Sequence, residues 1–227
     1  MSQEIAFSSN PIFSQLPAET LSKISKLSKT KEINKGTYLV NQGDEWPYLF
    51  HISRGQLVAE KDSMDGRRFV AASFKAGEIF WGITFFIDHA VMPASLIAFE
   101  DSFLDIWHQR DLKPIIESNG VFSWEVSKLV VSRMQYASEL LESMTFHPIA
   151  VRLARLLLGI ADGKGEASIE RNLTLDEMAA RIGSTREMVC RLLYKFSDEG
   201  LIKITRTDFL ITDPGQLFKR AQKQDHT

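Results

Sequence analysis

The stretch LTLDEMAARIGSTREMVCRLLYKFSDEG, residues Leu173–Gly200, contains two short amphipathic segments separated by one glycine. Each segment opens with a hydroxyl residue followed three positions later by a glutamate: Thr174 with Glu177, and Ser184 with Glu187. This is the pattern of a capping box, which satisfies backbone N–H groups at a helix start. Gly183 tolerates the positive φ of a tight turn. The stretch therefore predicts a helix-turn-helix, whose second helix is shaped to enter a DNA major groove.

The second segment sorts its residues onto two faces. At roughly 100° per residue, one side gathers the residues expected to face a core. They are Thr185, Val189, Leu192, Leu193 and Phe196. The opposite side carries Glu187, Arg191 and Tyr194, with Cys190 at its edge. Arg186 is off-centre but lies in the first turn, which points deepest into a groove.

The polar side has the chemistry of a base reader. Arginine offers two donors that match O6 and N7 of guanine, and glutamate accepts from N4 of cytosine. Arg186, Glu187 and Arg191 therefore form a predicted base-reading set. The alternative is a solvated helix face on which Glu187 and Arg191 pair at i, i+4.

Two β-prone runs follow and predict a wing. Leu201–Ile204 and Phe209–Thr212 flank the polar turn Thr205–Asp208. Arg206 near its tip either touches a phosphate or is a solvated turn residue. The predicted DNA-contacting set is Thr174, Ser184, Thr185, Arg186, Glu187, Arg191, Tyr194 and Arg206.

Composition places few restrictions on the chain. Its 227 residues allow one large or two small domains, and 44% hydrophobic with 25% charged residues is ordinary for a globular protein. No apolar run approaches the roughly 18 residues of a membrane span. Met1–Ala6 lacks the basic and apolar regions of a signal peptide. One cysteine excludes an internal disulfide and fits a reducing cytoplasm.

The net charge of −2 is unusual for a DNA-binding chain, but it is unevenly distributed. Residues 1–145 carry 14 Lys and Arg against 18 Asp and Glu, whereas residues 146–227 carry 13 against 11. The basic excess therefore lies in the helix-turn-helix part. Because it is small, we expect affinity to depend on dimerisation and on local charge placement.

Short β-prone runs alternate with turn signals from Glu32 to Trp107. Glycines recur at intervals of eleven or twelve residues: Gly43, Gly55, Gly66 and Gly77. Many short strands with evenly spaced turns indicate a closed roll. We therefore predict a double-stranded β-helix, or jelly roll, within residues 1–120.

The apolar period becomes helical between Phe122 and about residue 144. Five residues step by four, three, four and three: Val130, Met134, Ala137, Leu141 and Met144. This narrow seam predicts a coiled-coil homodimer, because a symmetric reader needs two half-sites. The alternative is a helix packed on its own domain. Pro148 breaks the helix, so we predict a dimerisation helix at 121–146, a winged helix-turn-helix domain at 147–227, and an α+β fold class.

The order of these parts resembles the CRP/FNR family of bacterial transcription regulators. The resemblance covers about residues 10–215 and is strongest in Val151–Leu157 and Leu173–Gly200. It implies that Arg186 and Arg191 contact guanines of a TGTGA-type half-site and that Glu187 contacts a cytosine on the opposite strand. The docking geometry is that of the family. RNA polymerase is a further partner that the resemblance implies.

The effector chemistry of the family does not carry over. Its cyclic-nucleotide members hold ribose and cyclic phosphate with a Gly-Glu pair and then an Arg-Ser. Here Glu78 falls too early, Trp81-Gly82 occupies the place of the pair, and no arginine lies between Arg68 and Arg110. A buried phosphate without a cationic partner is unfavourable. We therefore expect an effector other than cyclic AMP, or none.

Other cofactors have weak support in the sequence. One cysteine excludes a cluster held by several thiolates. Haem, in a gas- or redox-sensing regulator, is the alternative, since the chain has isolated histidines at His51, His89, His108 and His147. An aromatic pocket is predicted from Phe80, Trp81, Phe85 and Phe86. Each histidine also reads as a surface or turn residue and the aromatic cluster as core, so no cofactor is the first expectation.

Two other classes of function compete with a DNA-binding regulator. An enzyme on a cupin-like roll would hold a metal through paired histidines, and no His-x-His occurs, so neither catalysis nor a metal is expected. The second class is a ligand-binding module that acts through protein partners. In such a module the helix with the pattern Arg-Glu-x-x-x-Arg would have no function. Cys190, beside Arg191, is either a chemical switch or a small residue that fits beside DNA.

Overall fold

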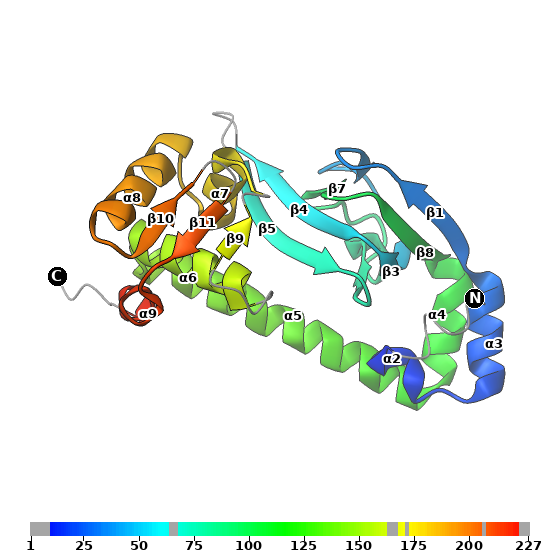
Figure 1. The fold of residues 1–227 in the computed structure, drawn as a ribbon. Coiled ribbons are helices and arrows are strands. Elements are labelled where there is room, and N and C mark those ends of the chain that lie inside the picture. Colours follow the sequence, from blue (N-terminus) through cyan, green and yellow to red (C-terminus); the bar gives the residue numbers. More distant parts are fainter. Residues whose placement is uncertain (1–9, 64–67, 163–167, 171–172, 206–207, 223–227) are drawn as a thin grey trace. The chain divides into compact units, whose positions relative to one another are not determined.

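The computed structural model describes residues 10–63, 68–162, 168–170, 173–205 and 208–222. They fall into two compact units, one within residues 1–61 and 71–135 and the other within residues 62–70 and 136–227. Figure 1 labels their helices and strands. Among the described residues, no helix is long and apolar enough to cross a membrane.

The first unit contains two four-stranded antiparallel sheets (Figure 1). One has the order β1-β8-β3-β6: Lys29–Ile33, Ser102–His108, Tyr48–Arg54 and Ile79–Trp81. The other has the order β2-β7-β4-β5: Tyr38–Val40, Ser95–Ala98, Gln56–Asp62 and Arg68–Lys75. Neighbours in each sheet come from distant parts of the sequence, as in a jelly roll. The predicted α+β fold with a jelly roll is confirmed.

Alternate residues of the roll strands face two different cores. Phe50 and Ile52 of β3 lie in the cluster between the sheets, whereas Leu49 lies in a second cluster with the helices. Trp107 of β8 is fully buried in that second cluster and donates from Nε1 to the carbonyl of Ile24 at 2.8 Å. Because alternate residues of a strand point to opposite faces, β3 and β8 contribute side chains both to the core between the sheets and to the core shared with the helices.

The described part of this unit has four α-helices and one 3-10 turn: α2, Pro11–Ser14; α3, Ala18–Leu27; η1, Ile83–Phe85; α4, Gln109–Ser118; and the first part of α5, Gly120–Phe146. Asn10 caps α2 and also donates from Nδ2 to the carbonyl of Gly77. The predicted helix at 122–144 is confirmed as α5, a single 27-residue helix.

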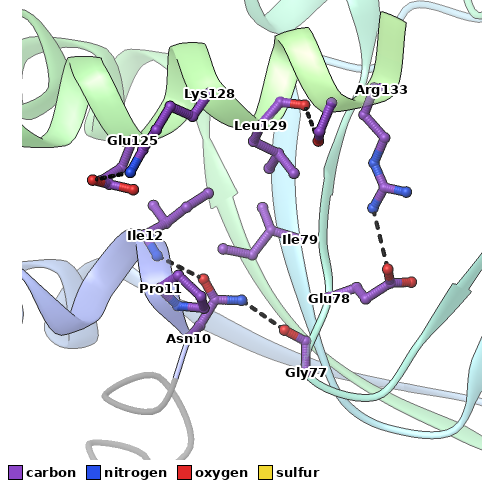
Figure 2. Close-up of a pocket in the computed structure, with 11 residues that line it drawn as sticks. Asn10, Pro11, Ile12, Gly77, Glu78, Ile79, Glu125, Lys128, Leu129 and Arg133 are labelled. Atoms are coloured by element: carbon purple, nitrogen blue, oxygen red, sulfur yellow. Dashed lines mark hydrogen bonds and ion pairs between the residues drawn. The ribbon is translucent and has the colours of Figure 1, made fainter. Parts of the chain in front are cut away.

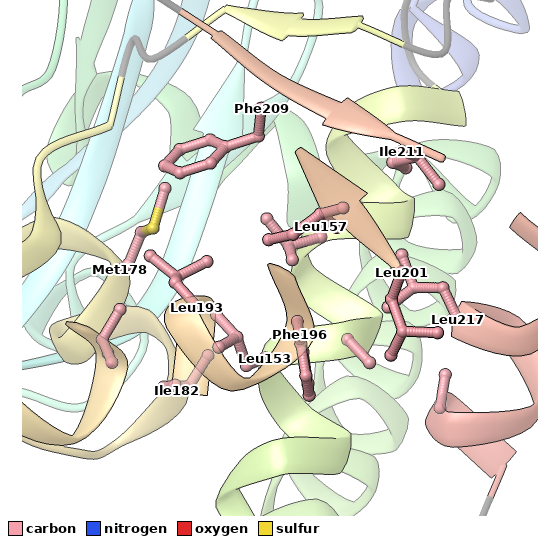
Figure 3. Close-up of a cluster of buried hydrophobic side chains, with 14 of the residues drawn as sticks. Leu153, Leu157, Met178, Ile182, Leu193, Phe196, Leu201, Phe209, Ile211 and Leu217 are labelled. Carbon is pink, nitrogen blue, oxygen red and sulfur yellow. The ribbon is translucent and has the colours of Figure 1, made fainter. Parts of the chain in front are cut away.

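The second unit is a winged helix-turn-helix with one core. Its helices are α6, Ile149–Asp162; α7, Leu175–Ile182; α8, Arg186–Asp198; and α9, Pro214–Gln222. Its sheet has the order β10-β11-β9: Ile202–Ile204, Asp208–Ile211 and Ser168–Glu170. Figure 3 shows side chains from the helices and the wing meeting in this core, including Leu157, Phe196 and Phe209.

Candidate nucleic-acid interface

The first capping box is present at the start of α7. The backbone N–H of Glu177 donates to Thr174 Oγ1 at 3.2 Å, and the N–H of Thr174 donates to Glu177 Oε2 at 2.6 Å. Gly183 ends the helix in the left-handed region with φ of 59°. A β-carbon there would lie 2.9 Å from Met144 Sδ and 3.2 Å from Arg152 Nη1, the ends of two flexible side chains, so the positive φ is the main reason for glycine at this position.

The second capping box, predicted at Ser184 and Glu187, is wrong. The N–H of Ser184 still bonds the carbonyl of Ala179 at 2.9 Å, so the turn extends one residue further. Thr185 is the N-cap of α8, and its hydroxyl accepts from the N–H of Met188 at 3.3 Å. Thr185 is exposed, which also corrects its predicted place on the core face.

The other predicted core residues of α8 are confirmed. Val189, Leu193 and Phe196 are almost fully buried, and Leu192 packs beside them. Consequently, one face of α8 is held in the core of the unit and the opposite face is free of it.

The predicted reading residues lie together on that opposite face. Arg186, Glu187, Arg191 and Tyr194 are all exposed, and Cys190 is half-buried beside them. Hydrogen bonds from its own backbone N–H and from the Thr185 hydroxyl lower the pKa of Glu187, so its carboxylate is an acceptor at neutral pH. Arg206 lies outside the described residues.

One charged neighbour was missed by sequence reasoning. Arg186 Nη1 lies 3.3 Å from Asp176 Oδ2, which projects from the first turn of α7. Acidic residues are common in a first turn because they suit the helix dipole, so the sequence did not mark Asp176 as a partner of the reading helix.

Helix α5 carries an exposed apolar stripe. Met134 and Leu141 are 66% and 69% exposed, and Ala137 is exposed between them. Val130 and Met144 are only half-exposed: Val130 lines a groove with Trp81, and Met144 packs against Arg152. Two exposed residues outside the predicted seam, Trp124 and Val131, continue the stripe seven residues apart and mark a second heptad position.

The four predicted pocket aromatics do not share one pocket. Phe80 points between the sheets, with its ring centroid 4.2 Å from that of Phe74. Phe85 is buried in the helix-covered cluster. Only Trp81 and Phe86 line one groove, with α5. The prediction failed because it treated neighbouring residues as one surface, whereas alternate strand residues face opposite sides.

The histidines are in four different settings. His51 is buried in β3, and its Nδ1 lies 3.3 Å from Asp105 Oδ2, so its expected surface or turn position is wrong. His89 is exposed near Glu45, His108 caps α4, and the ring nitrogens of His147 lie 2.9 and 3.4 Å from the guanidinium of Arg155 at the α5–α6 junction. Among the described residues, no three His, Cys, Asp or Glu side chains gather as metal ligands.

A roll followed by a winged helix-turn-helix defines a class of two-domain regulators, and comparison with known proteins supports that class. Residues 30–119 match the model of the cyclic nucleotide-binding domain, and residues 151–220 match the Crp-like helix-turn-helix domain. The chain belongs to the CRP/FNR family of DNA-binding transcription regulators.

The similar proteins are distant in sequence. The chain is 24% identical over 196 residues to a cyclic AMP receptor protein of Thermus thermophilus, covering 86% of this chain and 89% of the relative. A crystal structure of a putative CRP/FNR-family regulator from Eubacterium rectale has a TM-score of 0.80 at 22% identity, covering 94% and 98% of the two chains. The c-di-GMP-responsive global regulator of Xanthomonas campestris has a TM-score of 0.74 at 17% identity, covering 87% and 100%.

Proposed function

We propose that this chain is a cytoplasmic, homodimeric regulator that reads a palindromic TGTGA-like DNA site through α8 and acts with RNA polymerase. The observation that carries the proposal is the exposed set Arg186, Glu187 and Arg191 on the face of α8 opposite the core. Two arginine forks and a carboxylate within two helical turns suit guanine and cytosine edges.

Binding to a palindromic duplex and to a scrambled one tests base reading. Arg191→Ala and Arg186→Ala should each weaken binding to the palindrome by about 1–3 kcal/mol, with a smaller loss on the scrambled duplex. Lys195→Ala is the matched control, because it removes the same charge from the exposed surface of the same helix. Equal losses on both duplexes would mean that the two arginines contact phosphates and do not read bases.

Dimerisation through α5 is supported by its exposed apolar stripe. Leu141→Glu would place like charges at a two-fold axis and should yield monomers in sedimentation, whereas Gln135→Glu, an exposed position beside the stripe, should remain dimeric. A dimer of unchanged affinity for Leu141→Glu would put the interface elsewhere.

The roll is proposed to work without cyclic AMP. Between β6 and β7, Met92 and Ala94 are buried with the apolar residues between the sheets, where a cyclic phosphate would need a cation. Calorimetry with cyclic AMP and cyclic GMP tests this directly, and micromolar binding of either would overturn it. The c-di-GMP-responsive relative supports the idea that this fold serves more than one effector.

A haem-based sensor remains the second candidate. It would rest on a histidine ligand: His89 is exposed, whereas His51 is engaged by Asp105 and His147 by Arg155. An absorption spectrum of the protein as purified decides between the two, since haem has an intense visible band.

A further inference from the structure

A cavity of about 460 Å³ opens in the first unit, outside the space between the two sheets. Figure 2 shows its walls: the segment around Asn10, the turn at Gly77 between β5 and β6, and one side of α5. Its volume lies within the range of small-molecule sites, roughly 300–1,000 Å³.

The floor of this cavity is apolar and well supported. Ile12 and Ile79 belong to the buried helix-covered cluster, and Leu129 of α5 packs against the same cluster. Ile79 precedes Phe80 in β6, so the floor and the interior of the roll lie on opposite faces of that strand. The cavity is therefore separate from the space between the sheets, into which Phe80 points.

Arg133 lies at one end of the cavity. Its guanidinium is close to Phe74 and Glu78, and its Nε–H makes no hydrogen bond with the described residues. Its charged group lies 5.0 Å from the centroid of Phe74, and Nη2 lies 3.5 Å from Glu78 Oε1. That separation exceeds the roughly 2.7–2.9 Å of a charge-assisted hydrogen bond. Nε of Arg133 is buried and has no hydrogen-bond partner among the described residues. A buried donor left unpaired costs free energy, so a ligand that draws the guanidinium into a new hydrogen bond would be favoured.

The other charges around the cavity indicate what the ligand is. Lys128 at the far end pairs closely with Glu125, at 2.7 Å, and is partly exposed. Glu78 already accepts the N–H of Lys75 at 2.8 Å with its second oxygen, so it has little capacity for a cationic ligand. The Glu78 charge also disfavours a doubly charged phosphate, whereas a planar carboxylate matches the arginine fork.

We propose that this cavity binds a small monocarboxylate with an apolar body, the carboxylate on Arg133 and the body on Ile12, Ile79 and Leu129. Val131 and Met134 flank Arg133 on the exposed stripe of α5, so a bound acid would act on the proposed dimer helix. That regulatory consequence rests on the proposed function; the binding itself does not.

Calorimetry without DNA tests the binding, with hexanoate and benzoate as probes and hexanamide and benzamide as their neutral counterparts. At least one acid should bind saturably, and its amide should bind roughly tenfold more weakly or not at all. Arg133→Gln should weaken the acid by a similar factor, while Lys128→Gln, which removes the same charge from the same helix, should change it less than about twofold.

Absence of binding by both acids at millimolar concentration would overturn the proposal, and so would equal losses in the two variants. The comparison of acid with amide uses the unaltered protein, so it stands even where Arg133→Gln unfolds. A protein that binds the acid but not the palindromic duplex would refute the proposed function alone.

Discussion

The aromatic run of the roll and the reading helix differ in how their side chains are distributed. On α8, residues three and four apart share a face, so Val189 and Phe196 turn into the core while Arg191 is left in solvent. From Phe80 to Phe86 the chain passes from a strand to a 3-10 turn, and adjacent aromatics go to different surroundings.

The difference shows what each pattern can predict. A helical period identifies two faces of one element, and one hydrophobic side is enough to orient it. A short aromatic run holds no such period, and its residues separate as the backbone alternates and then turns. The helical period placed the residues of α8 on the right faces, whereas closeness in sequence alone misplaced the aromatic residues of the roll.

The largest contrast expected is within the aromatic run. Phe85→Ala should destabilise the protein by about 3–5 kcal/mol, because Phe85 is 2% exposed in a packed cluster. Phe86→Ala should change stability by less than about 1 kcal/mol, because Phe86 is 46% exposed. Urea unfolding of both variants measures the difference. Equal losses would mean that the two rings share one environment after all.

The start of the reading helix offers a smaller contrast. Thr185→Ala should cost about 1 kcal/mol of stability, since the hydroxyl that accepts from Met188 is lost. Ser184→Ala, its neighbour, should cost less than about 0.5 kcal/mol, because Ser184 does not cap α8. Thermal unfolding compares them. A larger loss at Ser184 would restore the capping box predicted from the sequence.

Loss of the ion pair between Asp176 and Arg186 should change the affinity for DNA by a few-fold. Asp176 holds Arg186 near α7 and adds a negative charge to the predicted DNA face. Asp176→Asn should therefore raise affinity for a scrambled duplex by about threefold to fivefold, and for the palindrome by less. Asp198→Asn, an exposed acid at the other end of α8, is the control. Equal gains on both duplexes would mean that Asp176 only repels DNA and does not position Arg186.

The smallest expected effect is a pH dependence of stability. It should arise in the roll unit and not at the start of the reading helix. In the roll unit His108 caps α4, accepting from the N–H of Arg110 at 3.1 Å, and burial with the Arg110 charge lowers its pKa below 6.5. The unfolded chain then binds the proton more readily, so stability should fall as pH drops from about 7 to 5.5. His108→Asn keeps an acceptor and should flatten that slope. Thr185, a hydroxyl cap, should make no such contribution. An unchanged slope would exclude the imidazole as its source.

The fold and the orientation of α8 followed from the sequence because periods and glycine spacing report burial. The residues that sequence reasoning missed act across space. Asp176 meets Arg186 only through the turn, and Arg133 meets Phe74 and Glu78 only once α5 packs on the roll. The buried pair of His51 and Asp105 likewise depends on strands β3 and β8 being neighbours, a pairing that no local pattern encodes.

Gly183 brings the turn of the helix-turn-helix close to the side chains of two other helices. With Met144 and Arg152 filling the space where a β-carbon would be, the turn rests directly on the end of α5 and the start of α6. A side chain added at position 183 would press first on Met144 and Arg152, the two side chains that link the turn to α5 and α6. A substitution at Gly183 would therefore be felt at the junction of α5 and α6 as well as in the turn itself.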